Sequence, residues 1–252
     1  MVSRTELLQA LTTILEPHYF QDYCPNGLQV EGCDTIKTLV TGVSASQALV
    51  DAAIKENADA ILVHHGYFWK GENPCLTGMK FQRIKKLIEH NINLFAYHLP
   101  LDAHPELGNN AQLAKQLGII VEGGLEPENP RSIGNVGSLT ESVTGEAFAA
   151  RLEAVLSRKP LHVAGSGRSI KRVAWCTGGA QGYIEKAVAL GVDAFITGEA
   201  SEQTTHVANE CGIHFFAAGH HATERYGAAS LGEFIANKFQ LNHRFIDIDN
   251  PV

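Results

Sequence analysis

Residues Ile36–His65 read IKTLVTGVSASQALVDAAIKENADAILVHH, and their pattern is the clearest indication of the fold. Apolar runs at Thr38–Val43 and Ala60–Val63 predict two buried strands. Apolar residues at helical spacing across Ala45–Glu56 predict a helix between them. A strand, a helix and a second strand in this order form a βαβ unit with parallel strands. The stretch therefore indicates an α/β domain.

The second half of the chain repeats this stretch. Ile170–Glu199 aligns with Ile36–His65 without a gap, and the pairs Lys37/Lys171 and Asp59/Asp193 are identical. In each half the next apolar strand again leads to a histidine. The repeat predicts two similar α/β/α layered domains with mixed, mostly parallel sheets, related by internal duplication. A chance similarity between two βαβ units is the alternative.

The boundary between the halves is predicted within residues 122–135, EGGLEPENPRSIGN, which are rich in glycine, proline and acid. We expect a first domain at 1–125 with the motifs HHG and HxxxD. We expect a second domain at 126–252 with the motifs TGE and GHxxxE. The closing helix near 223–238 and the strand His243–Ile248 are expected to pack back on the first domain.

Composition excludes several classes of protein. The 252 residues are 44% hydrophobic and 19% charged, which is ordinary for a globular protein. The net charge of −7 argues against nonspecific nucleic-acid binding, which needs a basic face. The five scattered cysteines without a CxxC motif predict free thiols in a reducing compartment. Without a signal-peptide pattern or a long apolar run, we expect a cytoplasmic protein that does not enter membranes.

Histidines end the second strand of the first half. Successive side chains on a strand point to opposite faces, so His64 and His65 can serve one site only if the strand has ended. Gly66 directly after them permits the turn that this requires. The pair also suits two metals, with one histidine for each. The alternative is one functional and one packing histidine.

The segment HLPLD follows the predicted strand at 93–97. Pro100 argues against a regular helix between His98 and Asp102, so we expect a structured turn. Asp102 is a suitable hard ligand for a metal. The alternative is a turn carboxylate that caps the next segment.

The segment GHHATE follows the predicted strand at 213–218. His220 and Glu224 lie at positions i and i+4 of a helix start, so they share one helix face. They can bind one ion together, or Glu224 can bridge two. The alternative is a capping carboxylate and a buried histidine. His221 is expected to face elsewhere.

These segments together predict a metal site in the cleft between the two halves. Strand ends converge at one edge of a parallel sheet, and imidazole with carboxylate is the usual donor set for zinc, iron or manganese. Five protein ligands exceed the three typical of one catalytic ion and suit two divalent ions about 3.5–4 Å apart. The candidate ligands are His64, His65, Asp102, His220 and Glu224. Glu199 corresponds to His65 in the repeat, and it either lies near the same cleft or is a solvated loop acid.

The segments HHGYFW, HLPLDAHPELG and GHHATER resemble signature segments of the NIF-three-like family, whose members are also known as GTP cyclohydrolase 1 type 2 homologues. The resemblance runs from PNGLQVEG to the closing FIDI and fits the short YbgI type, which lacks a central inserted domain. It implies that the family's metal ligands fall on the five candidates, with Glu224 touching both ions. His65 and Asp102 would then bind one ion, and His64 and His220 the other. It also implies a toroidal homohexamer with metal sites facing an internal cavity.

The expected reaction is hydrolysis of a small, nucleotide-like or pterin-like molecule, because two metals activate water against a carbonyl or phosphoryl group. His98 is the candidate for proton transfer or substrate contact. Phe68 and Trp69 can stack on a ring and Lys70 can meet a phosphate, unless the aromatic residues anchor the loop or an oligomer contact. The alternative function is a non-catalytic metal-binding assembly with a regulatory, storage or interaction role.

Overall fold

The computed structural model describes residues 1–252 and divides them into two compact units. Unit 1 comprises Met1–Leu101 and Gly227–Asp249, and unit 2 comprises Asp102–Tyr226 and Asn250–Val252. This division differs from the expected boundary at residue 125. Residues 122–135 connect two strands of unit 2 that are hydrogen-bonded to each other in antiparallel fashion, so this segment is a connection inside one unit.

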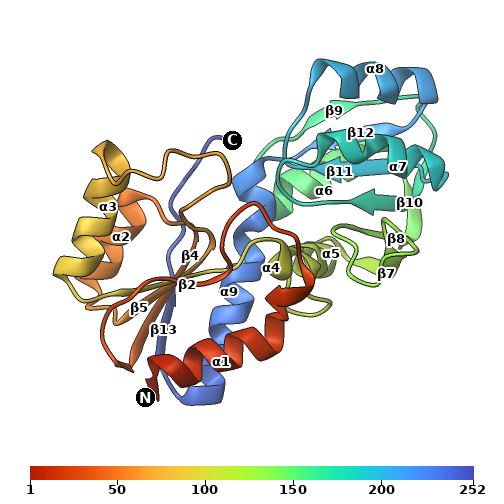
Figure 1. The fold of residues 1–252 in the computed structure, drawn as a ribbon. Helices are drawn as coiled ribbons and strands as arrows, with labels where there is room; N and C mark the ends of the chain where they lie inside the picture. Colours follow the sequence, from red (N-terminus) through yellow and green to blue (C-terminus); the bar gives the residue numbers. More distant parts are fainter. The chain divides into compact units, whose positions relative to one another are not determined.

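Unit 1 contains a five-stranded sheet in the order β13-β4-β5-β6-β2 (Figure 1). The first four strands in this order run parallel, and β2 pairs with β6 antiparallel. A separate antiparallel pair joins β1 to β3. The strands are β1 (Val2–Ser3), β2 (Gly27–Val30), β3 (Thr35–Ile36), β4 (Thr38–Ser44), β5 (Ala60–His65), β6 (Asn93–Ala96) and β13 (Asn242–Phe245).

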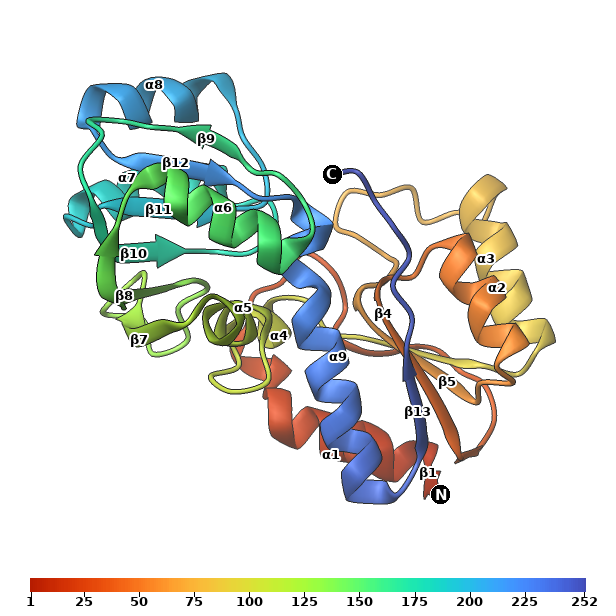
Figure 2. The same ribbon diagram turned by 180° about the vertical axis from the view of Figure 1, so that it is seen from behind.

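Helices cover both faces of this sheet (Figure 2). One face packs against α2 and α3, where Val40 and Ile61 join Leu49 in a single apolar cluster. The other face carries α1 and the Gly227–Phe239 part of α9. The helices are α1 (Arg4–Leu15), α2 (Gln47–Lys55), α3 (Gly78–Glu89) and α9 (His220–Phe239), with a 3-10 turn, η1 (Pro17–Tyr19).

Unit 2 contains a six-stranded sheet in the order β7-β8-β10-β11-β12-β9. The β10–β11 and β11–β12 pairings are parallel, and the other three are antiparallel. The predicted mixed sheets are therefore confirmed, whereas parallel pairings predominate only in unit 1. The strands are β7 (Ile119–Gly124), β8 (Asn135–Val143), β9 (Leu161–Val163), β10 (Ile170–Trp175), β11 (Ala194–Thr197) and β12 (His214–Ala217).

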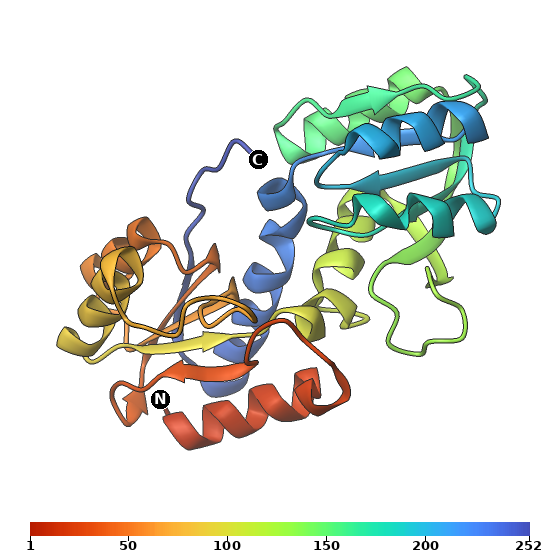
Figure 3. The same cartoon turned by 45° about the horizontal axis from the view of Figure 1, so that its top comes forward.

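The unit 2 sheet also lies between two helix layers. Phe148 of α6 packs with Trp175 on one face, together with residues of α5. On the other face Phe195 and Phe215 pack with residues of α7 and α8, which lie side by side in Figure 3. The remaining elements are α4 (Leu99–Ala103), α5 (Asn109–Leu117), α6 (Gly145–Leu156), η2 (Gln181–Tyr183), α7 (Ile184–Ala189) and α8 (Glu202–Cys211). No helix combines the length and apolarity needed to cross a membrane.

The two units contain the same arrangement of aspartate-to-backbone hydrogen bonds. The carboxylate of Asp59 accepts hydrogen bonds from the backbone N–H groups of Lys37 and Thr38, at 2.7 and 2.9 Å. In unit 2 the carboxylate of Asp193 accepts them from Lys171 and Arg172, at 3.0 and 2.8 Å. Each carboxylate thus joins the start of one parallel strand to the loop before the next. The predicted similarity of the two halves is confirmed.

Candidate metal centre

Two adjacent histidines end β5 in unit 1. We expected the strand to end before the two histidines, but it runs through His64 and His65. Their ring centroids nevertheless lie 4.4 Å apart. His64 is fully buried, and its Nδ1 donates to the carbonyl of Tyr97 at 3.1 Å. The Nδ1 atom of His65 lies 3.0 Å from Oγ of Ser44 in the neighbouring strand. Both rings are therefore oriented through Nδ1.

Gly66 follows directly on His65, the last residue of β5. Its φ is not positive, so it does not need the left-handed conformation that favours glycine. A Cβ at this position would clash with the amide oxygen of Gln29 and approach the Cβ of Ala96 to 2.5 Å. Glycine is required here because β2 and β6 pass close to the backbone.

His98 is held by a buried carboxylate. Its Nδ1 lies 2.7 Å from Oδ1 of Asp22, and the other carboxylate oxygen accepts from the backbone N–H of Leu99 at 2.9 Å. The Asp22 side chain is 3% exposed. Burial raises the pKa of Asp22, but hydrogen bonds from His98 and Asn26 outweigh it and lower the pKa below its usual value. The sequence offered no signal for Asp22, which lies in an irregular segment.

The three imidazoles of unit 1 form one cluster. The ring of His98 lies 5.0 Å from that of His64 and 5.7 Å from that of His65. One potential ligand atom from each lies within 4.8 Å of the others. The Trp69 ring stands edge-on to His98 at 5.0 Å. Unit 1 therefore offers nitrogen donors beside an indole ring.

The other residues of the aromatic loop lie differently. Phe68 packs against the apolar core of unit 1, as the anchoring alternative predicted, and adopts a positive φ of 67°. Lys70 is exposed, and its backbone N–H donates to the carbonyl of Tyr23. Of the three loop residues named from the sequence, only Trp69 has its ring against the imidazoles.

Asp102 lies on a short helix, α4, where the sequence predicted a turn. Pro100 occupies the first turn of this helix, where its missing N–H has no intrahelical partner to lose. Asp102 is 6% exposed, and its Oδ1 accepts from Nδ2 of Asn109 at 2.8 Å and Oγ1 of Thr177 at 3.3 Å. Neither partner is indicated by a pattern in the sequence.

His220 and Glu224 share one face of α9, as their spacing predicted. The Nε2 atom of His220 lies 3.3 Å from Oε2 of Glu224, and its Nδ1 lies 2.7 Å from Oε1 of Glu199. Glu199 is therefore the carboxylate partner of His220. Burial lowers the pKa of His220, but the hydrogen bonds and charges of the two glutamates outweigh it and raise the pKa to about 9.

Two buried carboxylates lie close together in unit 2. Glu224 is 2% exposed, and one of its oxygens lies within 4.8 Å of an oxygen of Asp102. Carboxylates removed from water at this separation repel each other, so a nearby cation stabilises them. Unit 2 therefore offers oxygen donors together with the imidazole of His220.

Glycines let the backbone approach these donors. Gly178 has a φ of 70°, and a Cβ there would clash with the carboxylate of Glu224 and lie 3.1 Å from Nε2 of His220. A Cβ at Gly198 would lie 2.5 Å from the Cα of His220. The glycines at 178 and 198 therefore make room for the donor side chains.

Comparison with known proteins identifies the family. A family model described as Duf34/NIF3 (NGG1p interacting factor 3) matches residues 2–251. A Pseudomonas aeruginosa protein named GTP cyclohydrolase 1 type 2 homolog is 57% identical over 250 residues, which cover 99% of each chain. The solved structure of protein ybgI matches with a TM-score of 0.96 and 54% identity, covering 100% of both chains. TTHA1606 from Thermus thermophilus matches at 0.90 and 32% with the same coverage. The chain thus belongs to the Duf34/NIF3 family, the one that its histidine motifs resemble.

Proposed function

We propose that this chain binds two divalent metal ions and acts as a metal-dependent hydrolase of a small molecule. The proximity of the buried carboxylates of Asp102 and Glu224 carries this proposal. A divalent cation between such groups offsets both their repulsion and the cost of removing them from water. The proposed ligands are His64, His65, Asp102, His220 and Glu224.

The orientation of the histidines supports the same proposal. Metal-bound histidines usually donate their second ring nitrogen to a carbonyl or carboxylate, which fixes the ring and its tautomer. Here Nδ1 of His64 faces the Tyr97 carbonyl, and Nδ1 of His220 faces Glu199. Nε2 is then the ligand atom. Mixed imidazole and carboxylate donors suit iron, zinc or manganese.

The family resemblance supports a single dinuclear centre in a cleft that draws ligands from both halves of the chain. Under this proposal Glu224 bridges two ions in each subunit. His65 and Asp102 hold one ion, and His64 and His220 hold the other. When bound, the ions lower the pKa of a water and polarise a carbonyl or phosphoryl oxygen.

His98 is the proposed proton-transfer group. Because Asp22 accepts from its Nδ1, the neutral ring carries its lone pair on Nε2, where it can accept a proton. Trp69 offers an aromatic face for a nucleotide-like or pterin-like ring. The name of the Pseudomonas relative, a GTP cyclohydrolase 1 type 2 homolog, supports a purine nucleotide as the first substrate to test.

Metal analysis of purified protein tests the binding part. We expect wild type to hold two divalent ions per chain and Glu224→Gln to lose both, because the substitution removes the bridging charge. Glu202→Gln is the matched control, since Glu202 is a helical glutamate whose side chain is 94% exposed. If Glu224→Gln retained both ions, the proposed centre would be wrong.

A substrate screen tests the hydrolase part. Nucleotides, phosphoesters and cyclic amides are offered to wild type, His98→Gln and Asp22→Asn. We expect both variants to keep their metal and to lose turnover by about 100-fold or more, the usual contribution of a positioned acid or base. If metal-loaded wild type hydrolysed none of these compounds, the proposed hydrolase function would be wrong, and a non-catalytic regulatory or interaction role would be favoured.

On the family resemblance alone, we also propose that the chain assembles as a toroidal homohexamer. Light scattering after gel filtration measures the mass directly. A species of six times the chain mass is expected, and a monomer at micromolar concentration would contradict the proposal.

A further inference from the structure

Three buried polar residues of unit 2 hold Asp102 in place. Its Oδ1 accepts hydrogen bonds from Nδ2 of Asn109 and from Oγ1 of Thr177. Asn110 holds the backbone, because its Nδ2 donates to the carbonyl of Asp102 at 3.1 Å. The Oδ1 atom of Asn110 accepts from the backbone N–H of Thr177 at 3.0 Å. The side chain and the backbone of Asp102 are therefore both fixed by their neighbours.

Two of these residues open helix α5. Asn109 and Asn110 are its first two residues, and both are fully buried. Asparagine is a weaker helix former than alanine, and a buried amide is costly unless it is hydrogen-bonded. Both amides bind residues outside α5. The start of this helix thus serves the surroundings of Asp102.

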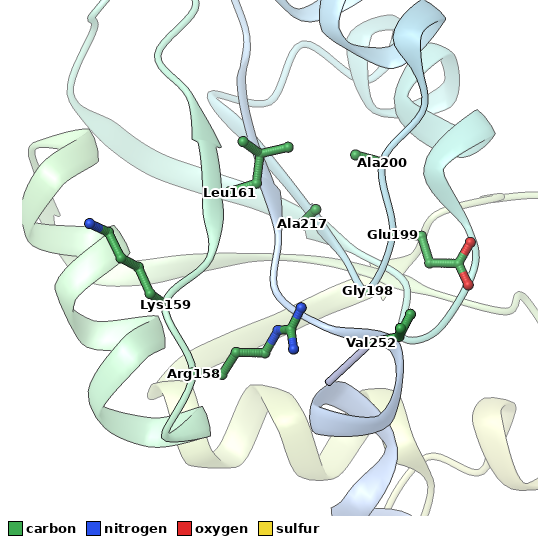
Figure 4. A pocket seen from close by; sticks show the side chains of 8 residues that line it. All are labelled: Arg158, Lys159, Leu161, Gly198, Glu199, Ala200, Ala217 and Val252. Carbon is green, nitrogen blue, oxygen red and sulfur yellow. The ribbon is translucent and has the colours of Figure 1, made fainter. Parts of the chain in front are cut away.

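Glu199, which holds His220, is more open to water than the residues that hold Asp102. It lines a cavity of about 540 Å³ at the ends of β11 and β12, where its carboxylate points away from the Arg158 guanidinium (Figure 4). The Glu199 side chain is 35% exposed, whereas Thr177 is 5% exposed. Water can replace a hydrogen bond that is lost at Glu199. A hydrogen bond lost at Oδ1 of Asp102 leaves a buried acceptor without that replacement.

We propose that Asn109 and Thr177 are positioning residues that make Asp102 bind its metal ion through Oδ2 alone. The two donors match the two lone-pair sites of Oδ1, so a bond from Oδ1 to the same ion would displace at least one of them. The displaced donor would then be buried without a partner, which is costly. Hydrogen bonds of this kind to ligating carboxylates commonly tune metal sites.

Binding through one oxygen has a consequence for the ion. A carboxylate fills one coordination position when it binds through one oxygen and two when it binds through both. The ion that the proposed function assigns to Asp102 has three protein ligands. Single-oxygen binding therefore keeps a position open for water, as catalytic ions require. This inference rests on the metal-binding part of the proposed function.

Cobalt substitution tests the positioning, because the visible absorption bands of Co²⁺ weaken as its number of ligands rises. Thr177→Val keeps the branched shape of the side chain and removes the donor, so Oδ1 can turn to the ion. We expect weaker bands per bound Co²⁺ and a metal affinity about tenfold below that of wild type. Thr177→Ser, which keeps the hydroxyl group, should restore both. Denaturant unfolding confirms that each variant is folded.

Thr204→Val is the matched control. Thr204 is a buried threonine of the same unit, and its hydroxyl lies 2.7 Å from Oγ of Ser201 at the start of α8. This variant should keep the bands and the metal affinity of wild type. An equal loss of affinity in Thr177→Val and Thr204→Val would indicate a general loss of stability and overturn the positioning role.

Asn109→Leu is an independent arm, because it removes the shorter of the two hydrogen bonds to Oδ1, at 2.8 Å. We expect its bands and affinity to decrease at least as much as those of Thr177→Val. Unchanged bands in both variants at full Co²⁺ occupancy would overturn this inference and leave the proposed function standing. Wild type that bound no Co²⁺ would overturn both the metal centre and this inference. Metal-loaded wild type without turnover would contradict the hydrolase alone, since no measurement here depends on turnover.

Discussion

Positions 44 and 178 are equivalent in the internal repeat, yet they serve the donor residues in opposite ways. In unit 1 the hydroxyl of Ser44 lies 3.0 Å from Nδ1 of His65 and orients that ring. In unit 2 Gly178 has no side chain, and its backbone passes close to the carboxylate of Glu224. One half positions a donor by adding a side chain, and the other by omitting one.

The two carboxylate–imidazole pairs also differ between the units, in how exposed the carboxylate is. Asp22 holds His98 and Glu199 holds His220, both at 2.7 Å. The Asp22 side chain is 3% exposed and that of Glu199 is 35% exposed. The strand–helix–strand frame is shared, while the proposed ligands differ. Unit 1 provides the imidazoles of His64 and His65, and unit 2 provides two buried carboxylates with the imidazole of His220. A repeated scaffold fixes where side chains project, and it leaves their chemistry open.

The largest loss of stability is expected on replacing Asp59 or Asp193, the residues at which the two halves are most alike. Asp59→Ala and Asp193→Ala each remove a charged acceptor from two backbone N–H groups, so each should cost about 3 kcal/mol of unfolding free energy. Denaturant unfolding measures this in single-tryptophan backgrounds. Trp175→Phe leaves Trp69 to report on unit 1, and Trp69→Phe leaves Trp175 to report on unit 2. The exposed Glu210→Ala serves as control, and a large loss at only one aspartate would break the equivalence.

The second prediction concerns the stability of the chain when a side chain is added at Gly178. Gly178→Ala should cost about 2 kcal/mol, because alanine is strained at a positive φ and its methyl group clashes with Glu224. Gly182→Ala is the matched control, since a Cβ at Gly182 meets nothing within 4 Å. Denaturant unfolding followed through Trp175 gives the difference. Equal stability of the two variants would show that the backbone need not approach Glu224.

A loss of similar size that depends on pH is expected at the Asp22–His98 pair. Asp22→Asn removes charge-assisted hydrogen bonds worth about 2 kcal/mol at neutral pH. Because the folded pKa of Asp22 is lowered, its contribution is present above the unfolded pKa of about 4 and is lost as pH falls through the folded value. The stability difference from wild type, measured by urea unfolding at pH 3 to 7, should therefore shrink only below about pH 4. A difference that shrank between pH 6 and 5 would contradict this assignment.

The smallest effect is expected at Ser44. Ser44→Ala removes one hydrogen bond to His65, which costs about 1 kcal/mol or less. If the hydroxyl orients the His65 ring for metal binding, the variant should also bind metal about tenfold more weakly, as is usual when a group that orients a metal-bound histidine is removed. Competition with a fluorescent chelator measures that affinity, with Ser46→Ala, which removes the cap of α2, as the control for a stability loss alone. Identical affinities for wild type and Ser44→Ala would argue against the orienting role.

The sequence predicted the regular elements better than the irregular ones. The β4–α2–β5 frame follows from periodic apolar residues, and its repeat predicts β10 and β11. Strands β2, β7 and β8 escaped prediction because they carry weaker patterns toward the sheet edges, where β7 leaves Ile120 and Val121 exposed. The glycine-rich segment 122–135 looked like a linker because a connection inside a sheet edge has the same composition as one between domains.

The local sequence pattern is enough to place the donors at the ends of particular strands. Apolar runs fix the strands, parallel pairing brings their ends to one edge of each sheet, and the residues that follow are then projected there. How each ring is held depends instead on contacts that form when the chain folds. The partners of His64, His98 and His220 lie 33, 76 and 21 residues away along the chain. Local propensity carries no information about such distant contacts, so Asp22, Tyr97 and the role of Gly178 emerged only from the folded chain.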